Sequence, residues 1–183
     1  MARLEESFPA PASLARLNFM DDASIAALAA LADDIGPKLA ARGETVAVAE
    51  SAAGGLIAAA LIGVPGASAF FRAGAVVYTP KARVTLLGLT RADLDGLRGA
   101  SEAYAGLLAQ RARDRFAATW AISETGAAGP NGNPYGDPAG HVCVAVSGPN
   151  GSLTRTVRTG LSDRRANMTI FAANALKLLA EQL

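Results

Sequence analysis

A serine followed by two glycines is the part of this sequence best suited to chemistry. Ser51 lies in "AVAESAAGGLIAAALI" (47–62), with Glu50 before it and Gly54 and Gly55 after it. The apolar run before Ser51 predicts a buried strand and the run after it a helix, so we expect the helix to begin near Ala52. The backbone N–H groups of such a turn favour anions. Ser51 could attack a carbonyl carbon whose oxyanion those groups hold, although the local pattern alone favours a plain helix cap.

Two other segments are expected to meet Ser51. Tyr78 ends the strand-like run 73–78, and "ETGAAGPNGNPYGDPAG" (124–140) is so rich in glycine and proline that it predicts a loop. Strand-to-helix loops gather at the carboxyl ends of parallel strands, which predicts one shared cleft. Because the loop and the Ser51 turn expose backbone N–H groups with little side-chain cover, we expect this cleft to bind an anion.

Alternating strand-like and helix-like segments must position these residues. Strands are predicted at 45–49, 73–78, 118–123, 141–147 and 152–158. Helices are predicted from Asp22 to Gly43 with a break or kink at Gly36-Pro37, over 54–62, from Pro80 to Gly88, from Ser101 to about Phe116, and at the C-terminus. This order predicts an α/β fold, a three-layer-like sandwich with a mostly parallel mixed sheet and an antiparallel C-terminal hairpin. Residues 1–21 are interpreted as an N-terminal extension and residues 22–183 as one domain.

Composition excludes several classes of protein. The 183 residues carry 17 basic and 16 acidic side chains, a net charge of +1 that gives no broad field for nucleic acid or an anionic membrane. Cys143 is the single cysteine and cannot form an internal disulfide, which fits a reducing cytoplasm. Asp137 and His141 are four residues apart, but Pro138 and Gly140 rule out a helical metal pair, so we expect no metal.

Five segments in this order resemble the C-terminal domain of the CinA family: "AESAAGG", "VVYTPKARVTLLGL", "GASEAYAGLLAQRAR", "ETGAAGPNGN" and "LSDRR". This is the family of nicotinamide-nucleotide amidohydrolases, also called competence/damage-inducible CinA-like proteins. The resemblance covers residues from about 25 to 183 and is to the stand-alone form. It implies hydrolysis of the carboxamide of nicotinamide mononucleotide to nicotinic acid mononucleotide and ammonia, without a metal or other cofactor.

The resemblance implies that Ser51 attacks the carboxamide while a tyrosine and a lysine manage protons. Tyr78 matches the tyrosine, but Arg83 stands five residues later where the family has lysine. Arginine stays charged at neutral pH and cannot act as the base. Lys81 is nearby but lies roughly 200° around the expected helix from Arg83. Any amidohydrolase activity is therefore expected to be weaker than that of relatives with the lysine, and Arg83→Lys is expected to raise it.

The remaining matched positions are partly altered. Ala52 and Ala53 replace a cysteine and a threonine, Met168 replaces a second arginine, and Glu124 adds a negative charge at a position that is usually small or apolar. The substrate-binding residues that the resemblance implies are Glu50, Gly54, Gly55, Thr125, Gly126, Ala128, Gly129 and Arg164.

Two functions of different classes follow. The first is an amidohydrolase, impaired by Arg83, that acts on a small nucleotide. The second is a catalytically altered homologue that binds a nucleotide or other ligand, or serves as an interaction protein. The alanine-rich helices favour a homo-oligomer in either case.

Overall fold

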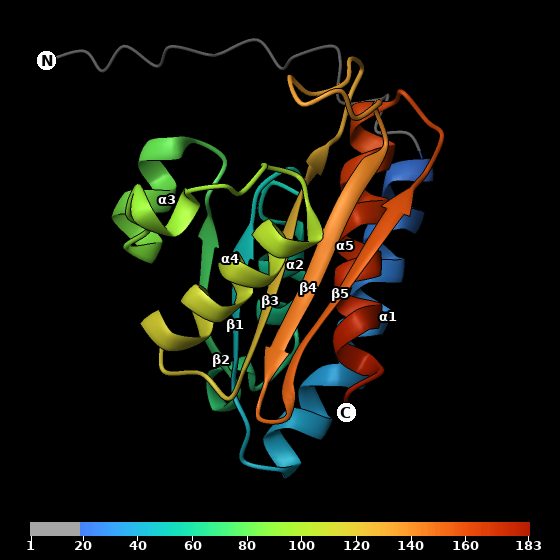
Figure 1. Ribbon diagram of the computed structural model, residues 1–183. Coiled ribbons are helices and arrows are strands. Elements are labelled where there is room, and N and C mark those ends of the chain that lie inside the picture. Colours follow the sequence, from blue (N-terminus) through green and yellow to red (C-terminus); the bar gives the residue numbers. More distant parts are fainter. Residues whose placement is uncertain (1–18) are drawn as a thin grey trace, which may run out of the picture.

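The computed structural model describes residues 19–183, with side chains from residue 25 onward (Figure 1). The first 18 residues of the expected N-terminal extension lie outside the described residues. The helices are α1 (Phe19–Ala41), α2 (Leu56–Ile62), α3 (Pro80–Leu87), α4 (Glu102–Arg115) and α5 (Arg164–Ala180). The strands are β1 (Val46–Glu50), β2 (Phe71–Val76), β3 (Trp120–Ala127), β4 (His141–Gly148) and β5 (Gly151–Arg158).

The five strands form one mixed sheet in the order β2-β1-β3-β4-β5. β1 pairs in parallel with β2 and β3, whereas β4 is antiparallel to both β3 and β5. The expected α/β fold, with a mixed sheet and a C-terminal hairpin formed by β4 and β5, is confirmed. The β3–β4 pairing is antiparallel as well, so β4 runs opposite to the other four strands of the sheet.

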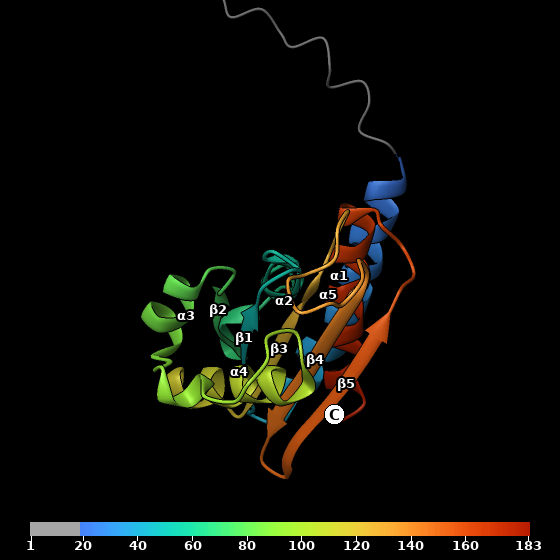
Figure 2. The same cartoon turned by 45° about the horizontal axis from the view of Figure 1, so that its top comes forward.

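Helices cover both faces of the sheet because strand residues alternate between two apolar layers. Val48, Ile122 and Val144 point toward α1, α2 and α5, which lie on one face (Figures 1 and 2). Ala47 and Ala121 point to the opposite face and pack in the cluster that includes residues of α4. Small side chains on the α4 face let that helix approach the sheet closely, so both faces of β1 and β3 are buried and their ends are held firmly.

Besides small shifts, such as β2 ending at Val76 so that Tyr78 follows the strand, three boundaries differ from the sequence prediction. α1 continues through Pro37 because its buried stripe, which includes Ile35 and Leu39, runs on both sides of the proline and packs against the core. α2 begins at Leu56 and not near Ala52, because Gly54 and Gly55 have φ angles of +69° and +106° and form a turn that a helix cannot contain.

The third difference is at β3, which extends to Ala127 where a loop was predicted from residue 124. The extension follows from pairing with β4, in which Gly126 lies opposite Val142. A Cβ atom on Gly126 would lie 2.4 Å from the carbonyl oxygen of His141, so this strand position requires a glycine. Sequence reasoning reads that glycine as a loop signal.

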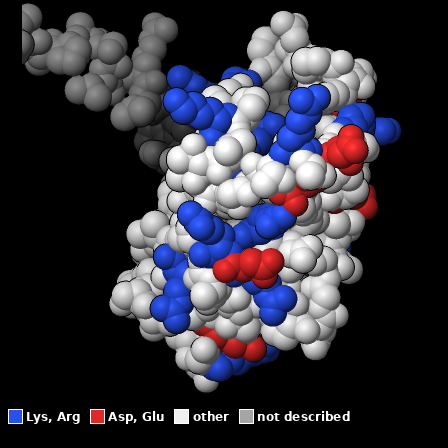
Figure 3. Space-filling view, turned by 60° about the vertical axis from the view of Figure 1, so that its left-hand side comes forward, with Lys and Arg blue, Asp and Glu red and all other residues white. Residues whose placement is uncertain are grey.

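The surface carries mixed charge over the side that bears α3. Figure 3 shows Lys and Arg side chains spread over this side with Asp and Glu side chains among them. Some of the basic and acidic side chains form ion pairs, such as Arg98 with Asp137 and Arg111 with Asp93. Within residues 19–183, no helix is both long enough and apolar enough to cross a bilayer.

Candidate active site

A cleft of about 310 Å³ opens beside the carboxyl ends of β1 and β3. Four segments that are distant in sequence form its wall: the turn after β1, the end of the segment after β2, the loop after β3, and the start of α5. The lining residues are Ala52, Tyr78, residues 126–134 and Arg164. The prediction that the Ser51 turn, Tyr78 and the glycine-rich loop share one cleft agrees with this arrangement.

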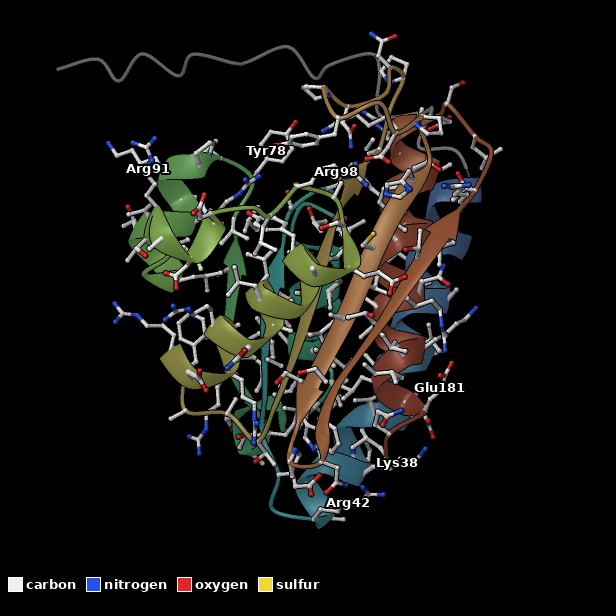
Figure 4. All side chains as sticks on the ribbon, in the orientation of Figure 1. Lys38, Arg42, Tyr78, Arg91, Arg98 and Glu181 are labelled. Atoms are coloured by element: carbon white, nitrogen blue, oxygen red, sulfur yellow. The ribbon has the colours of Figure 1, made fainter. Side chains whose placement is uncertain are left out.

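Arg164 joins two walls of the cleft. Its Nη1 donates a hydrogen bond to the carbonyl oxygen of Gly129 at 3.0 Å, and its Nη2 donates to the hydroxyl of Tyr78 at 3.4 Å. Tyr78 is 55% exposed and points toward the loop after β3 (Figure 4). A guanidinium held beside a hydroxyl at the mouth of a cleft is suited to an anionic group such as a phosphate.

A buried asparagine fixes the loop that faces Arg164. The amide of Asn167 on α5 donates to the carbonyl oxygens of Ala128 at 2.8 Å and Leu161 at 2.9 Å, and its own oxygen accepts from Thr159. Among residues 19–183, the backbone N–H groups of Gly129, Asn131 and Gly132 donate no backbone hydrogen bond. The cleft lining therefore includes a fixed loop with N–H groups that are available to a ligand.

Ser51 lies directly before the cleft residue Ala52 and is 7% exposed. Its backbone N–H donates to Oε2 of Glu124 at 3.1 Å, and the N–H of Ala53 donates to the same oxygen at 2.7 Å. The sequence suggested that N–H groups after Ser51 hold the oxyanion of a substrate. Instead, the Ala53 N–H already binds a carboxylate of the chain itself.

Glu124 and Glu50 are two buried carboxylic acids on neighbouring strands. Glu50 accepts hydrogen bonds from the N–H groups of Ile57 and Ala58, both at 3.1 Å. Burial raises the pKa of Glu50 above its ordinary value. Burial also raises the pKa of Glu124 to about 7, helped by the charge of Glu50 and opposed by hydrogen bonds from Ala53 and Ser51. Glu124 can therefore exchange a proton near neutral pH.

The raised pKa of Glu124 makes stability depend on pH. Between about pH 4.5 and 7 the folded protein keeps a proton on Glu124 that the unfolded chain releases, so stability falls as the pH rises through this window. The Glu124→Gln variant lacks this pH-dependent contribution to stability, and it keeps Glu50, so it serves as the reference protein. We expect the free energy of unfolding of the wild type, relative to this variant, to fall by on the order of 3 kcal/mol from pH 4.5 to 8. Urea unfolding at each pH measures it, and a constant difference would contradict the buried titration.

The two cationic side chains after Tyr78 lie outside the cleft wall. Arg83 donates from Nε to the carbonyl oxygen of Val77 at 3.1 Å and from Nη2 to that of Tyr78 at 3.4 Å. Its guanidinium lies 5.4 Å from the ring centre of Tyr104. Arg83 thus supports the backbone that carries Tyr78, and Lys81 is an exposed residue of the first turn of α3.

The structure brings some of the predicted site residues together and separates others. Tyr78, Gly126, Ala128, Gly129 and Arg164 line the cleft, and Ser51 adjoins it. The other predicted residues are absent from the lining: Glu50, Gly54, Gly55, Thr125, Lys81 and Arg83. Sequence reasoning missed Asn167 and the contact of Glu124 with the Ser51 turn. The signal for the latter was an acid directly after the apolar run "ATWAIS".

Comparison with known proteins supports one family assignment. Residues 28–183 match the sequence profile of the family described as the CinA C-terminal domain. A "CinA-like protein" of Desulforapulum autotrophicum is 37% identical over 150 residues, which cover 82% of this chain and 36% of that protein. Another from Anaeromyxobacter sp. is 43% identical over 142 residues, covering 78% of this chain and 34% of that protein. The chain thus spans about a third of the length of these relatives.

Solved structures with this fold cover most of both chains. A competence-damaged protein (CinA) superfamily protein from Escherichia coli superposes with a TM-score of 0.79 at 28% identity, covering 85% of this chain and 90% of that one. The competence/damage inducible protein CihA from Agrobacterium tumefaciens gives a TM-score of 0.78 at 33% identity, covering 85% and 94%. Sequence and fold therefore agree on the family.

Proposed function

Since the chain belongs to the family of the CinA C-terminal domain, we propose that its cleft is the active site of an amidohydrolase for nicotinamide mononucleotide. The products are nicotinic acid mononucleotide and ammonia. The observation that carries the proposal is the convergence of a serine turn, Tyr78, Arg164 and a loop with free N–H groups on one cleft. A nucleophile beside an anion site suits a substrate that has both a carboxamide and a phosphate.

Each part of the cleft has a role in this proposal. Ser51 attacks the carboxamide carbon, and the hydroxyl of Tyr78 donates a hydrogen bond to the departing nitrogen without giving up its proton. Arg164 and the N–H groups of Gly129, Asn131 and Gly132 hold the phosphate, because a guanidinium and unpaired backbone N–H groups favour anions. The phosphate then fixes the carboxamide end of the substrate near Ser51.

Arg164→Ala should weaken the binding of nicotinamide mononucleotide by about 10- to 100-fold, because it removes a charge-assisted contact worth about 1.5–3 kcal/mol. Calorimetric titration measures the change. Arg165→Ala is the matched control, because Arg165 is the next residue of the same helix, is exposed and lies outside the cleft wall. Equal affinities of the two variants would remove Arg164 from the phosphate site.

The second candidate function is a catalytically altered homologue that binds a nucleotide without hydrolysing it. The observation in its favour is that Arg83 is bonded to the carbonyl oxygens of Val77 and Tyr78 and cannot serve as a base. Measuring both ammonia release and binding of nicotinamide mononucleotide by the purified protein separates the two functions. Binding without ammonia release favours the altered homologue, and Ser51-dependent ammonia release favours the amidohydrolase.

A further inference from the structure

We propose that Glu124 is the acid–base partner of Ser51, accepting the proton of its hydroxyl during attack. This inference rests on the proposed function for the identity of the substrate, but not for the pairing of the two residues. It assigns to strand β3 the task of a base, which Arg83 cannot perform because it stays charged, and for which the exposed Lys81 has no bond to the Ser51 turn. It also gives a role to a buried acid that is bonded to the turn of the candidate nucleophile.

The carboxyl of Glu124 is fixed against the residue that carries the hydroxyl. Its Oε2 accepts the N–H groups of Ser51 at 3.1 Å and Ala53 at 2.7 Å, and the side chain is 0% exposed. Its Oε1 is buried and has no partner among the described residues. A buried polar atom without a partner is costly, and this one belongs to a carboxyl that is bonded to the backbone of the candidate nucleophile, which points to a group that is satisfied during a reaction.

The other titratable side chains at this end of the sheet lack either a bond to the Ser51 turn or a free accepting atom. Both oxygens of Glu50 accept N–H groups at the start of α2. Arg83 is bonded to backbone carbonyl groups, and the hydroxyl of Tyr78 lies beside the cationic Arg164. On β4, Nε2 of His141 lies 2.8 Å from the carbonyl oxygen of Ala100, and its buried Nδ1 also has no partner among the described residues, but no hydrogen bond joins His141 to the Ser51 turn. Within residues 25–183, Glu124 therefore combines a contact to the Ser51 turn with a free proton-accepting oxygen.

The surroundings of Glu124 suit a group that takes and returns a proton. Burial raises its pKa to about 7. Glu50 is the charged side chain that acts on it, and its negative charge raises the pKa further, whereas the N–H groups of residues 51–53 lower it. Val144 on β4 lies opposite in the sheet register and carries no charge. A base with a pKa near the working pH is the most effective.

In the proposed reaction, the carboxyl of Glu124 accepts and returns each proton that is transferred. As Ser51 Oγ bonds to the carboxamide carbon, its proton passes to Glu124 Oε1. The C–N bond then breaks, and the proton leaves on the nitrogen as ammonia. Water attacks the acyl carbon and gives one proton to Glu124. The ester bond to Oγ breaks, and that proton returns to Ser51 while the product acid forms.

Labelling of Ser51 by diisopropyl fluorophosphate tests the pairing without any assumption about the substrate. Ser51 Oγ bonds to phosphorus, fluoride leaves, and the proton goes to Glu124. Intact-mass and peptide analysis should locate the adduct on Ser51, with a rate that rises with pH through about 7 and then levels off. We expect Glu124→Gln to label at least ~100-fold more slowly at pH 8, the effect of a lost general base.

Two variants control for folding and for loss of charge. Glutamine keeps an oxygen for the N–H groups of Ser51 and Ala53, and circular dichroism checks that the variant is folded. Glu102→Gln removes an exposed carboxylate that bonds Thr154 and Thr156 on β5, and it should label like the wild type. The pH profile of the wild type stands even if Glu124→Gln does not fold.

The assignment is overturned if wild-type Ser51 is not labelled, if its labelling rate does not change between pH 5.5 and 8.5, or if Glu124→Gln labels within about 3-fold of wild type. Its failure is distinct from that of the proposed function. Glu124-dependent labelling without ammonia release from nicotinamide mononucleotide would reject the substrate and keep the pairing. Equal ammonia release by the wild type and Glu124→Gln would keep the function and reject the pairing.

Discussion

Ser51→Ala should lower ammonia release from nicotinamide mononucleotide by at least ~1,000-fold while its dissociation constant changes less than about 3-fold. The expectation follows from the cleft: the phosphate contacts assigned to Arg164 and the loop after β3 do not involve Ser51, whereas the attacking oxygen belongs to Ser51 alone. A coupled ammonia assay gives the rate, and calorimetry gives the affinity.

The control for this variant is Ser152→Ala, an exposed serine on β5 that lies outside the cleft wall. It should match the wild type in both measurements. If Ser51→Ala keeps its turnover, Ser51 is not the nucleophile. If both rate and affinity collapse together, Ser51 serves mainly to form the turn that shapes the cleft.

Arg83→Lys should raise ammonia release by about 10- to 100-fold. The arginine is bonded to the carbonyl oxygens of Val77 and Tyr78 and remains charged, whereas a lysine amine can lose its proton when it is buried or beside another cation. General bases contribute about 10²- to 10⁴-fold to rates, and only part of that factor is expected because the lysine would act beside Glu124, the base already assigned to Ser51.

Arg91→Lys is the matched control, because Arg91 is an exposed arginine at the start of the short helix Ala92–Leu94 and lies outside the cleft wall. It should leave the rate unchanged. The idea of an impaired catalyst is contradicted if Arg83→Lys gives no increase at any pH from 6 to 9, or if the wild type already turns over as fast as relatives that have the lysine.

Local signals in the sequence were sufficient for much of the fold. Thr79 caps α3 by accepting the N–H of Ala82, with Pro80 in the first helical position, and Gly88 ends that helix with a φ angle of +65°. Ser101 caps α4 in the same way. These features depend on residues within one or two turns of helix, so the sequence pattern could predict them.

Features that depend on distant residues could not be predicted in the same way. Glu124 bonds to residues more than 70 positions away, and nothing near either segment indicates that contact. The extension of β3 into the glycine-rich segment depends on β4, and the continuity of α1 through Pro37 depends on its packing. The candidate cleft was predictable because strand order alone brings its turns together, whereas the partners of its N–H groups required the structure.

The most direct test of the central claim is ammonia release from nicotinamide mononucleotide by the wild-type protein at pH 7.5, with nicotinic acid mononucleotide measured in parallel and Ser51→Ala as the blank. We predict slow release of the two products in equal amounts, which the blank does not show. If the wild type binds nicotinamide mononucleotide yet releases no more ammonia than Ser51→Ala, the cleft is not an amidohydrolase site for this nucleotide.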